Sequence, residues 1–420
     1  SYKQDSPNPR YNARDVAVMR GKIENAIVVL GSATPSIESM HNAHSGKYKL
    51  LELTERADNA KMPSVQIVNM FEEKKKSLVH GTLSIVLINA IIERLKKKEG
   101  VILFQNRRGF SSYLECQDCG NIPQCRHCAV SLTYHKAKGQ LRCHYCGYTI
   151  NMPQVCPACK NHHLGVVGFG TQRIEDELNE YFQKMGITAK IARMDLDTTS
   201  KKGSHRRLLH SFASGEVDIL LGTQMVAKGL DFERVTLVGV INADMQLFLP
   251  DFRASERTYQ LLTQVSGRAG RHSDKPGEVY IQTNHPYSPA IQSALLASYS
   301  DFFNYEIVQR KNAFYPPFSR FNIIELSGKE LTDVIRNAKY FAELLPQNSK
   351  YMTVLGPVEP VIPRIRTYYR RIIVIKNSKT SDAKGAKLRA ALKTALEKYY
   401  AKYPSGDVRL TVDIDSYSGL

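Results

Sequence analysis

The amino-acid sequence predicts an α/β protein in which a cysteine-rich module interrupts a parallel β-sheet and a small α+β domain follows. Three observations lead to this prediction. Short β-branched runs alternate with helical patterns, all eight cysteines fall between Cys116 and Cys159, and the pattern changes after about residue 290. Strands that alternate with helices are typical of a parallel sheet covered on both faces. The cysteine segment is therefore expected to be an insertion into that sheet domain.

The strands of the sheet are assigned from apolar runs that end in turns. Residues 27–36 (IVVLGSATPS) combine a short β-branched run, a small-residue turn and a helix start at Ser36. A helical pattern over 82–98 ends in lysines and a glycine, which is a typical C-terminal signal, and the buried strand 101–106 comes next. Further strands are predicted at 166–170, 188–195, 217–223 and 235–244, with helices from Thr171, around 203–213 and over 254–265.

The chain beyond residue 290 has a different pattern of elements. Strands are predicted within 314–326 (FYPPFSRFNIIEL), 368–377 (YYRRIIVIKN) and 408–415 (VRLTVDID), with helices near 330–345 and 382–400. This order favours a separate small α+β domain.

Charge and composition narrow the class of function. The 420 residues include 58 Lys and Arg against 40 Asp and Glu, a formal net charge of +18. Such an excess favours a polyanionic partner, because each neutralised phosphate releases condensed counterions, although a basic surface can also serve solubility. No apolar run approaches the roughly 20 residues that span a bilayer, and the polar opening is no signal peptide. We therefore expect a cytoplasmic protein without a membrane segment that binds nucleic acid.

The cysteines form four C-x-x-C pairs. They are Cys116/Cys119, Cys125/Cys128, Cys143/Cys146 and Cys156/Cys159. A two-residue spacer lets both thiolates of a pair point at one metal ion, and two pairs complete a tetrahedral site. A reducing compartment disfavours disulfides, and a redox motif would not recur four times. Eight thiolates therefore predict two structural zinc ions.

The spacing of the cysteines does not by itself decide which two C-x-x-C motifs share a zinc ion. Five residues separate Cys119 from Cys125, so a sequential arrangement would need a very tight loop, whereas fourteen separate Cys128 from Cys143. Nesting would join the two inner motifs at one zinc ion and the two outer motifs at the other, and a cross-brace is the alternative. His127 and His144 lie inside C-x-x-C spacers, where complete cysteine sets leave them no coordination vacancy, and we expect both on the surface.

Two loops after predicted strands have the residue types of a nucleotide site, at the edge where open α/β sheets bind ligands. In the turn 31–34 (GSAT), small hydroxyl residues such as Thr34 can relay changes between a nucleotide site and a nucleic-acid groove. In 222–232 (GTQMVAKGLDF), Gly222 and Gly229 permit close backbone approach, Thr223 and Lys228 suit phosphate contact, and Asp231 can orient water or a partner lobe.

A third loop, 264–271 (QVSGRAGR), places Arg268 and Arg271 three residues apart among small residues. Both can project from one helix end toward a γ-phosphate, where planar guanidinium groups stabilise the charge that develops in phosphoryl transfer. The alternative is a basic helix end with glycine caps.

In this order, the three loops resemble motifs III, V and VI of superfamily 2 helicases. The segment NRRGF (106–110) resembles the motif IV region of the PriA family within that group. The motif V sequence, the eight-cysteine insert between motifs IV and V, and the elements YPPF (315–318) and VLGP (354–357) are together similar to the PriA family of replication-restart helicases. The resemblance covers nearly the whole chain.

The resemblance implies a domain organisation and an activity. It implies the remainder of helicase lobe 1 over 1–56, a RecA-like lobe 2 over 57–115 and 165–290, the zinc insert over 116–164, and a DNA- or partner-binding domain over 291–420. It further implies an ATP- and Mg²⁺-dependent 3′-to-5′ DNA helicase, cytoplasmic, bacterial and nucleoid-associated. Such a helicase recognises forked DNA and single-strand/duplex junctions at abandoned replication forks and works with primosome proteins and single-strand-binding protein. A monomer is expected.

The resemblance also assigns roles to particular residues. The eight cysteines would bind two zinc ions in the nested arrangement. Gly229 and Asp231 would belong to the ATP-coupled motif V, with Thr34 also on the nucleotide side. Gln264, Arg268 and Arg271 would face ATP, with Arg271 as the leading arginine finger.

DNA contacts are predicted at three places. Tyr11 and Arg14 lie in the stretch that couples DNA contact to ATP hydrolysis in this family, and Arg107 and Arg108 lie in the motif IV region. The basic, aromatic segment 364–371, with Arg370 and Arg371, can stack bases or bind phosphates. Its alternative is an amphipathic strand with a solvated basic face.

One departure from the family pattern limits the expected activity. The sequence has no G-x-x-x-x-G-K-[ST] and no D-E-x-H box, the elements that hold the β/γ-phosphates and Mg²⁺. SYKQ at the start resembles the residues just after that box in the family, so we expect the chain to be cut there and to bind DNA weakly without hydrolysing ATP. Two alternatives are a non-catalytic zinc-ribbon adaptor for DNA or a primosome partner, and an RNA-directed superfamily 2 enzyme.

Overall fold

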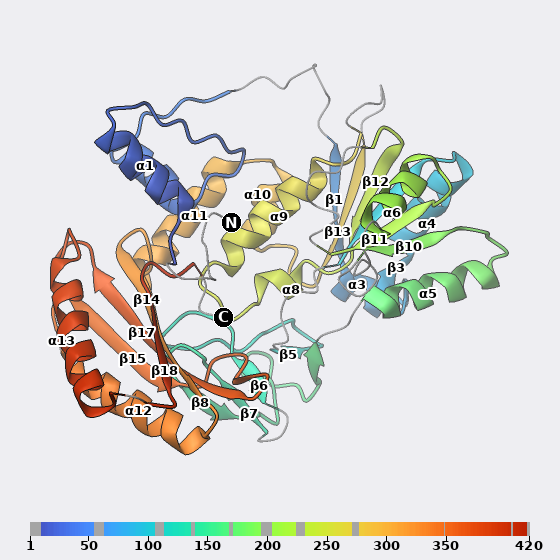
Figure 1. Cartoon of the computed structure of the whole chain (residues 1–420). Coiled ribbons are helices and arrows are strands. Elements are labelled where there is room, and N and C mark those ends of the chain that lie inside the picture. The colour runs from blue at the N-terminus through green and yellow to red at the C-terminus, as the bar shows by residue number, and fades with distance from the viewer. Residues whose placement is uncertain are drawn as a thin grey trace.

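The computed structural model describes residues 10–53, 63–105, 113–135, 139–167, 171–194, 204–223, 232–270, 277–347, 349–404 and 406–417. A parallel sheet with its helices, the cysteine module and a C-terminal antiparallel sheet form the three main parts of the molecule (Figure 1). None of the helices in the described part of the chain combines the length and apolar character needed to cross a membrane.

The parallel sheet has six strands. Their order is β1 (Ser64–Asn69), β13 (Glu278–Thr283), β12 (Val235–Val240), β4 (Gly100–Phe104), β11 (Ile219–Gly222) and β10 (Ile191–Met194). Every neighbouring pair is parallel, and β4, β11 and β12 are buried along their whole length. Central parallel strands are covered on both faces, which explains why these strands read as continuous apolar runs.

Alternate residues of β4 show how the sheet is covered. Val101 and Leu103 pack with helices α4 (Ile85–Lys96) and α5 (Thr171–Lys184). Ile102 and Phe104 face the opposite way, toward α6 (Ser204–Ala213), α9 (Ala254–Ser266) and α10 (Pro289–Leu295). This two-residue period is the geometry of an extended strand. The predicted α/β sheet domain is confirmed.

Smaller elements connect the sheet. They are α3 (Met70–Lys75), the hairpin β2 (Val79–His80) and β3 (Leu83–Ser84), and α8 (Asp244–Leu247). Ser84 caps α4, since its hydroxyl accepts a hydrogen bond from the Leu87 N–H at 3.2 Å.

The cysteine module is a five-stranded antiparallel sheet inserted between β4 and α5. Its order is β8 (Thr149–Asn151), β7 (Gln140–Arg142), β6 (Thr133–His135), β5 (Tyr113–Cys116) and β9 (Leu164–Val167). Because β5 pairs with β9, we propose that the module extends from 113 to 167, slightly beyond 116–164. The strand predicted at 166–170 is thus corrected: its described part belongs to this sheet and not to the parallel one.

A second correction concerns residues 27–30, which form no strand. Ile27 is 94% exposed and Val29 is 83% exposed. A β-branched run becomes a strand only beside a partner strand, and none pairs with it among the described residues. The helix predicted from Ser36 is confirmed as α2 (Ile37–His44), capped by the Ser36 hydroxyl. The helix α1 (Ala13–Ile23) precedes it.

The C-terminal domain is an antiparallel sheet with helices on one face. The strands lie in the order β15 (Met352–Val358), β17 (Tyr368–Ser378), β14 (Ser319–Gly328) and β18 (Arg409–Asp413), and β16 (Arg364–Ile365) pairs with β17. Ile324, Leu326, Ile373 and Ile375 contact α12 (Leu331–Leu344) and α13 (Ala386–Lys402).

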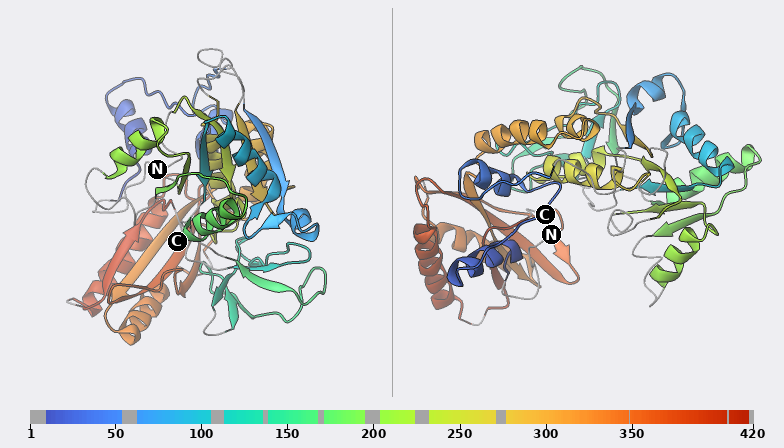
Figure 2. Two further views of the ribbon diagram at one scale, coloured as in Figure 1. Left: turned by 90° about the vertical axis from the view of Figure 1, so that its right-hand side faces the viewer. Right: turned by 90° about the horizontal axis from the view of Figure 1, so that it is seen from above.

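The opposite face of that sheet packs on the cysteine module. Phe321, Ile323, Ile372 and Val374 share one core with Tyr145. Figures 1 and 2 show the module and the C-terminal domain side by side.

Helix α11 (Tyr299–Asn312) belongs with the parallel sheet, because Phe302 and Phe303 lie in its core. We therefore propose that the C-terminal domain begins after α11 and not at residue 291.

Candidate functional site

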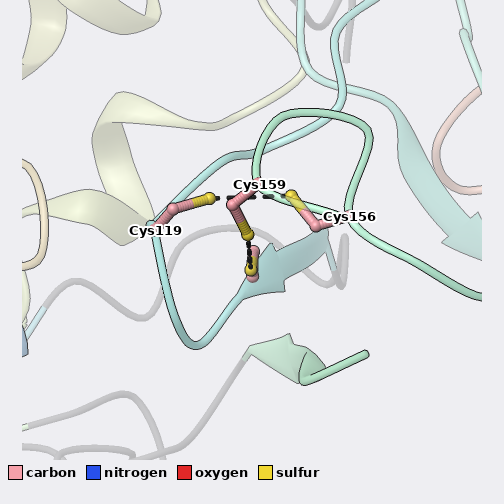
Figure 3. Close-up of side chains that lie close together, drawn as sticks. Cys119, Cys156 and Cys159 are labelled. Atoms are coloured by element: carbon pink, nitrogen blue, oxygen red, sulfur yellow. Dashed lines mark hydrogen bonds between the residues drawn. The ribbon is translucent and has the colours of Figure 1, made fainter. Parts of the chain in front are cut away.

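The eight cysteines form two separate clusters within the cysteine module. One contains Cys116, Cys119, Cys156 and Cys159, and the other contains Cys125, Cys128, Cys143 and Cys146. Figure 3 shows three side chains of the first cluster turned toward one another. In each cluster all four sulfur atoms lie within 4.8 Å of one another. The nested pairing is confirmed and the cross-brace is wrong.

The sulfur distances fit a shared metal ion. The Sγ atoms of Cys116 and Cys159 are 3.6 Å apart, and those of Cys125 and Cys146 are 3.5 Å apart. A disulfide would bring two sulfur atoms to about 2.05 Å. Four thiolates in a tetrahedron around zinc, each about 2.3 Å from the ion, have sulfur–sulfur distances close to those observed. All four ligands at each site are thiolates, so no position is left for a reactive water. Both sites fit structural zinc.

Each C-x-x-C pair closes through the same turn. The N–H of Gly120 donates to the Cys116 carbonyl at 2.9 Å, and the N–H of Gly147 donates to the Cys143 carbonyl at 3.0 Å. Both glycines have φ above +70°, where a side chain is strained. Ala129 and Lys160 occupy the equivalent place after the other two pairs, with φ of 49° and 65°.

The cluster of Cys125, Cys128, Cys143 and Cys146, called the inner cluster, also contacts the C-terminal domain. Cys125, Cys128 and Cys143 are buried in the core that contains Phe321 and Val374. The Tyr315 hydroxyl donates to the Cys128 carbonyl at 2.8 Å.

A lysine of the C-terminal domain strengthens this contact. The ammonium group of Lys376 lies 3.7 Å from the centre of the Tyr315 ring, and burial lowers the pKa of this lysine. The outer cluster differs, because Cys119 is exposed.

The two histidines of the spacers behave differently. His127 is exposed, as predicted. His144 is 1% exposed, so its predicted surface position is wrong. Its Nδ1 lies 2.6 Å from the Glu359 carbonyl oxygen, and its Nε2 lies 3.2 Å from Nε2 of His135. Burial lowers the pKa of His144 to about 4. No pattern near His144 in the sequence indicates the C-terminal segment that covers this ring.

The structure brings the turn at 31–34, predicted as motif III, next to helix α9, which leads into the loop predicted as motif VI. Thr34 is buried, and the side-chain amide of Gln260 on α9 donates to the Thr34 carbonyl at 3.4 Å. Gln264 is exposed near the end of α9, and Arg268 lies one turn beyond it. Gly229, Asp231 and Arg271 lie outside the described residues, as do Arg107 and Arg108.

A buried ionic network reinforces this contact, and sequence analysis did not find it. It joins Glu38 on α2, Arg253 and Glu256 at the start of α9, and Glu306 and Arg310 on α11. Arg253 contacts Glu38 at 2.6 Å and Glu256 at 3.2 Å. Arg310 contacts Glu256 at 2.9 Å and Glu306 at 2.7 Å.

The network also holds the backbone of α2. The Ile37 N–H donates to the Glu256 carboxylate at 3.1 Å. Burial alone would raise the pKa of Glu38, but the charges of Arg253 and Arg310 hold it well below its ordinary value. Only the i,i+4 pair on α11 and the i,i+3 pair on α9 were visible in the sequence as a signal.

Of the two DNA contacts predicted in the N-terminal segment, Tyr11 is exposed, whereas Arg14 is bonded within the protein. Tyr11 is 41% exposed. Arg14 donates to the hydroxyls of Ser36 at 2.7 Å and Ser39 at 3.2 Å, and it therefore ties α1 to the start of α2.

Arg370 and Arg371 are engaged within the protein, contrary to a free basic face. Arg370 forms two hydrogen bonds with the Glu325 carboxylate, at 3.1 and 2.8 Å, and Arg371 lies 3.6 Å from Glu359. Both side chains are only 14% exposed. A role of Arg370 and Arg371 in DNA binding therefore stays a prediction. The exposed basic residues of this hairpin are instead Arg364 and Arg366.

Comparison with known proteins gives matches in all three parts of the chain. Residues 125–150 match the PriA DNA helicase Cys-rich region domain, residues 159–273 match the helicase conserved C-terminal domain, and residues 311–417 match the primosomal protein N C-terminal domain. The replication restart protein PriA of Bacillus subtilis is 44% identical over 99% of this chain and 50% of its own length. The PriA proteins of Chlamydia pneumoniae and Synechocystis are 42% and 41% identical over 90% of this chain, and over 50% and 46% of their own lengths.

These matches agree with the order of the parts in the structure. The chain spans about half the length of these curated relatives. The zinc module lies inside the helicase lobe, and the C-terminal sheet packs on that module. The chain belongs to the PriA family of replication restart proteins.

Proposed function

We propose that this chain provides the second helicase lobe, the zinc module and the C-terminal domain of an ATP- and Mg²⁺-dependent 3′-to-5′ DNA helicase that restarts replication at forked DNA. Its proposed partners are forked DNA, primosome proteins and single-strand-binding protein. The contact between α2 and α9 supports the motor role most directly. It joins the motif III turn to the helix that ends near Gln264 and Arg268. The net charge of +18 fits a DNA partner.

The motor role is tested by replacing Arg268 and Arg271 with alanine in the full-length protein. We expect unwinding to fall by about three orders of magnitude or more, because arginines that stabilise a transferring phosphoryl group contribute effects of that size. Fork binding and two zinc ions per chain should be retained. Arg206→Ala is the control, since this arginine is exposed on α6 of the same lobe. Unwinding at the control rate by the double variant would favour a non-catalytic adaptor instead.

The isolated chain is proposed to lack ATPase activity. Its sequence contains neither a phosphate-cradling G-x-x-x-x-G-K-[ST] loop nor a D-E-x-H box. DNA-stimulated phosphate release by the purified 420-residue chain would contradict this.

DNA contact by the C-terminal domain is proposed for the exposed end of the β16–β17 hairpin. Replacing Arg364 and Arg366 with alanine should weaken fork binding and lower the slope of log affinity against log salt by about two, one unit for each lost phosphate contact. The measurement is fluorescence anisotropy of forked DNA at several salt concentrations. Arg409→Ala removes an exposed cation from β18 of the same sheet and should change the slope less. Equal slopes for all three proteins would refute the assignment.

A further inference from the structure

A third cluster of metal-ligating side chains lies where the cysteine module meets the parallel sheet. Glu115 comes from β5, Asp244 is the first residue of α8, and His285 lies just after β13. One ligand atom from each lies within 4.8 Å of the other two. The two carboxylates are almost fully buried, with 2% and 1% of their residues exposed. Two buried negative charges together are costly unless a cation balances them.

Hydrogen bonds orient the two carboxylates. Asn284 donates its side-chain amide to Glu115 at 2.8 Å and its backbone N–H to Asp244 at 2.7 Å. The Thr283 hydroxyl donates to Asp244 as well. These donors are neutral, so they fix the positions of the oxygens without adding a positive charge of their own.

The imidazole of His285 is held with one nitrogen directed at this cluster. Its Nε2 lies 2.7 Å from the Gly120 carbonyl oxygen, which only accepts hydrogen bonds, so Nε2 carries the hydrogen. Its Nδ1 faces Asp244 Oδ1 at 3.5 Å and has no hydrogen-bond partner within the described ranges. In the neutral ring, a nitrogen lone pair therefore faces a carboxylate. Histidines that bind metals typically donate their other N–H to a backbone carbonyl in this way.

Tyr113 provides a separate indication of a missing partner. The residue is 5% exposed, and its hydroxyl finds no hydrogen-bond partner in the part of the chain that the structure describes. This unpartnered buried hydroxyl lies on β5, the strand that also carries Glu115.

We propose that Glu115, Asp244 and His285 bind a third divalent metal ion, distinct from the two thiolate zinc sites. Two carboxylate oxygens and one imidazole nitrogen suit a first-row transition ion between Mn²⁺ and Zn²⁺, whereas thiolates select zinc. His285 also borders a hollow of about 380 Å³ together with Gly120 and Phe248. Because its ligands come from β5, α8 and the end of β13, the ion would fasten the cysteine module to the helicase lobe.

The probe for this site is Mn²⁺, added to the zinc-loaded chain and followed by electron paramagnetic resonance. Mn²⁺ has the lowest affinity of the series and does not displace zinc from thiolates. We expect one tightly bound Mn²⁺ per chain while elemental analysis still gives two zinc ions. His285→Asn and Glu115→Gln should each weaken Mn²⁺ binding by at least about tenfold, on the scale known for disturbed metal sites.

His163→Asn is the matched control. His163 pairs with Asp118 at 3.0 Å on the surface of the same module, but no second carboxylate joins that pair in the described structure. The control should bind Mn²⁺ as the parent chain does. The zinc count reports whether each variant retains its module. Absence of bound Mn²⁺ in the parent chain, or equal Mn²⁺ affinity in the parent and in both site variants with zinc retained, would overturn the proposal.

Discussion

Replacing Cys128 with serine is expected to remove one zinc ion per chain and to loosen both the cysteine module and its contact with the C-terminal domain. Structural zinc contributes about 10–16 kcal/mol of apparent binding free energy in small zinc domains, so its loss exceeds the stability of a typical domain. Cys128 is fully buried in the core shared with Tyr315 and Phe321. Elemental analysis should therefore give one zinc ion, and limited proteolysis should cleave both the module and the neighbouring C-terminal domain.

The outer zinc site offers a matched comparison for this variant. Cys119→Ser should also lower the zinc content to one, but Cys119 is exposed and its cluster lies outside the core shared with the C-terminal sheet. Protease resistance of the C-terminal domain should then persist. If Cys128→Ser kept two zinc ions, or if both variants exposed the C-terminal domain equally, the inner site would not be the joint between the module and that domain.

Local patterns predicted most of the fold because the physical constraint behind them is local. Val101–Phe104 reads as a strand from its apolar run alone, and the two-residue spacer of each C-x-x-C pair places two thiolates on one metal ion. The nested pairing was favoured by loop length and by resemblance, and the structure confirms it.

Features that depend on distant partners could not be predicted in the same way. The run 27–30 has the composition of a strand, but no strand pairs with it in the ranges that the structure describes. His144 is buried only because the segment at Glu359 covers it, 215 residues later. Arg370 reads as a free cation in its own segment, and its partner Glu325 is 45 residues away.

The buried ionic network between α2, α9 and α11 is the clearest case, and it leads to the second large expected effect. Arg310→Ala should lower the free energy of unfolding by about 3–5 kcal/mol, because removing one partner leaves buried carboxylates without their counter-charge. Arg310 is 1% exposed and contacts Glu256 and Glu306 at 2.9 and 2.7 Å. The measurement is urea unfolding followed by circular dichroism, since the chain contains no tryptophan.

The pH dependence of the stability lost in Arg310→Ala distinguishes the loss of a charge from the loss of packing. Burial already raises the pKa of Glu306 from 4.5, and losing Arg310 should raise it further. A carboxyl whose pKa is raised in the folded state favours folding below its unfolded pKa and opposes it as the pH rises. The deficit of Arg310→Ala should therefore be largest near neutral pH and shrink toward about pH 4.5.

The exposed ion pair between Arg336 and Asp333 is the control for the stability loss of Arg310→Ala. Arg336 contacts Asp333 at 2.7 Å, as close as Arg310 contacts Glu306, but its side chain is 66% exposed. Arg336→Ala should cost at most about 0.5 kcal/mol, because water screens the pair and solvates the remaining carboxylate. The difference between the two variants would then measure what burial and the second ion pair of Arg310, with Glu256, add. Equal losses in the two variants, or a loss in Arg310→Ala that does not change with pH, would show that the network does not hold α2 against α9 through charge.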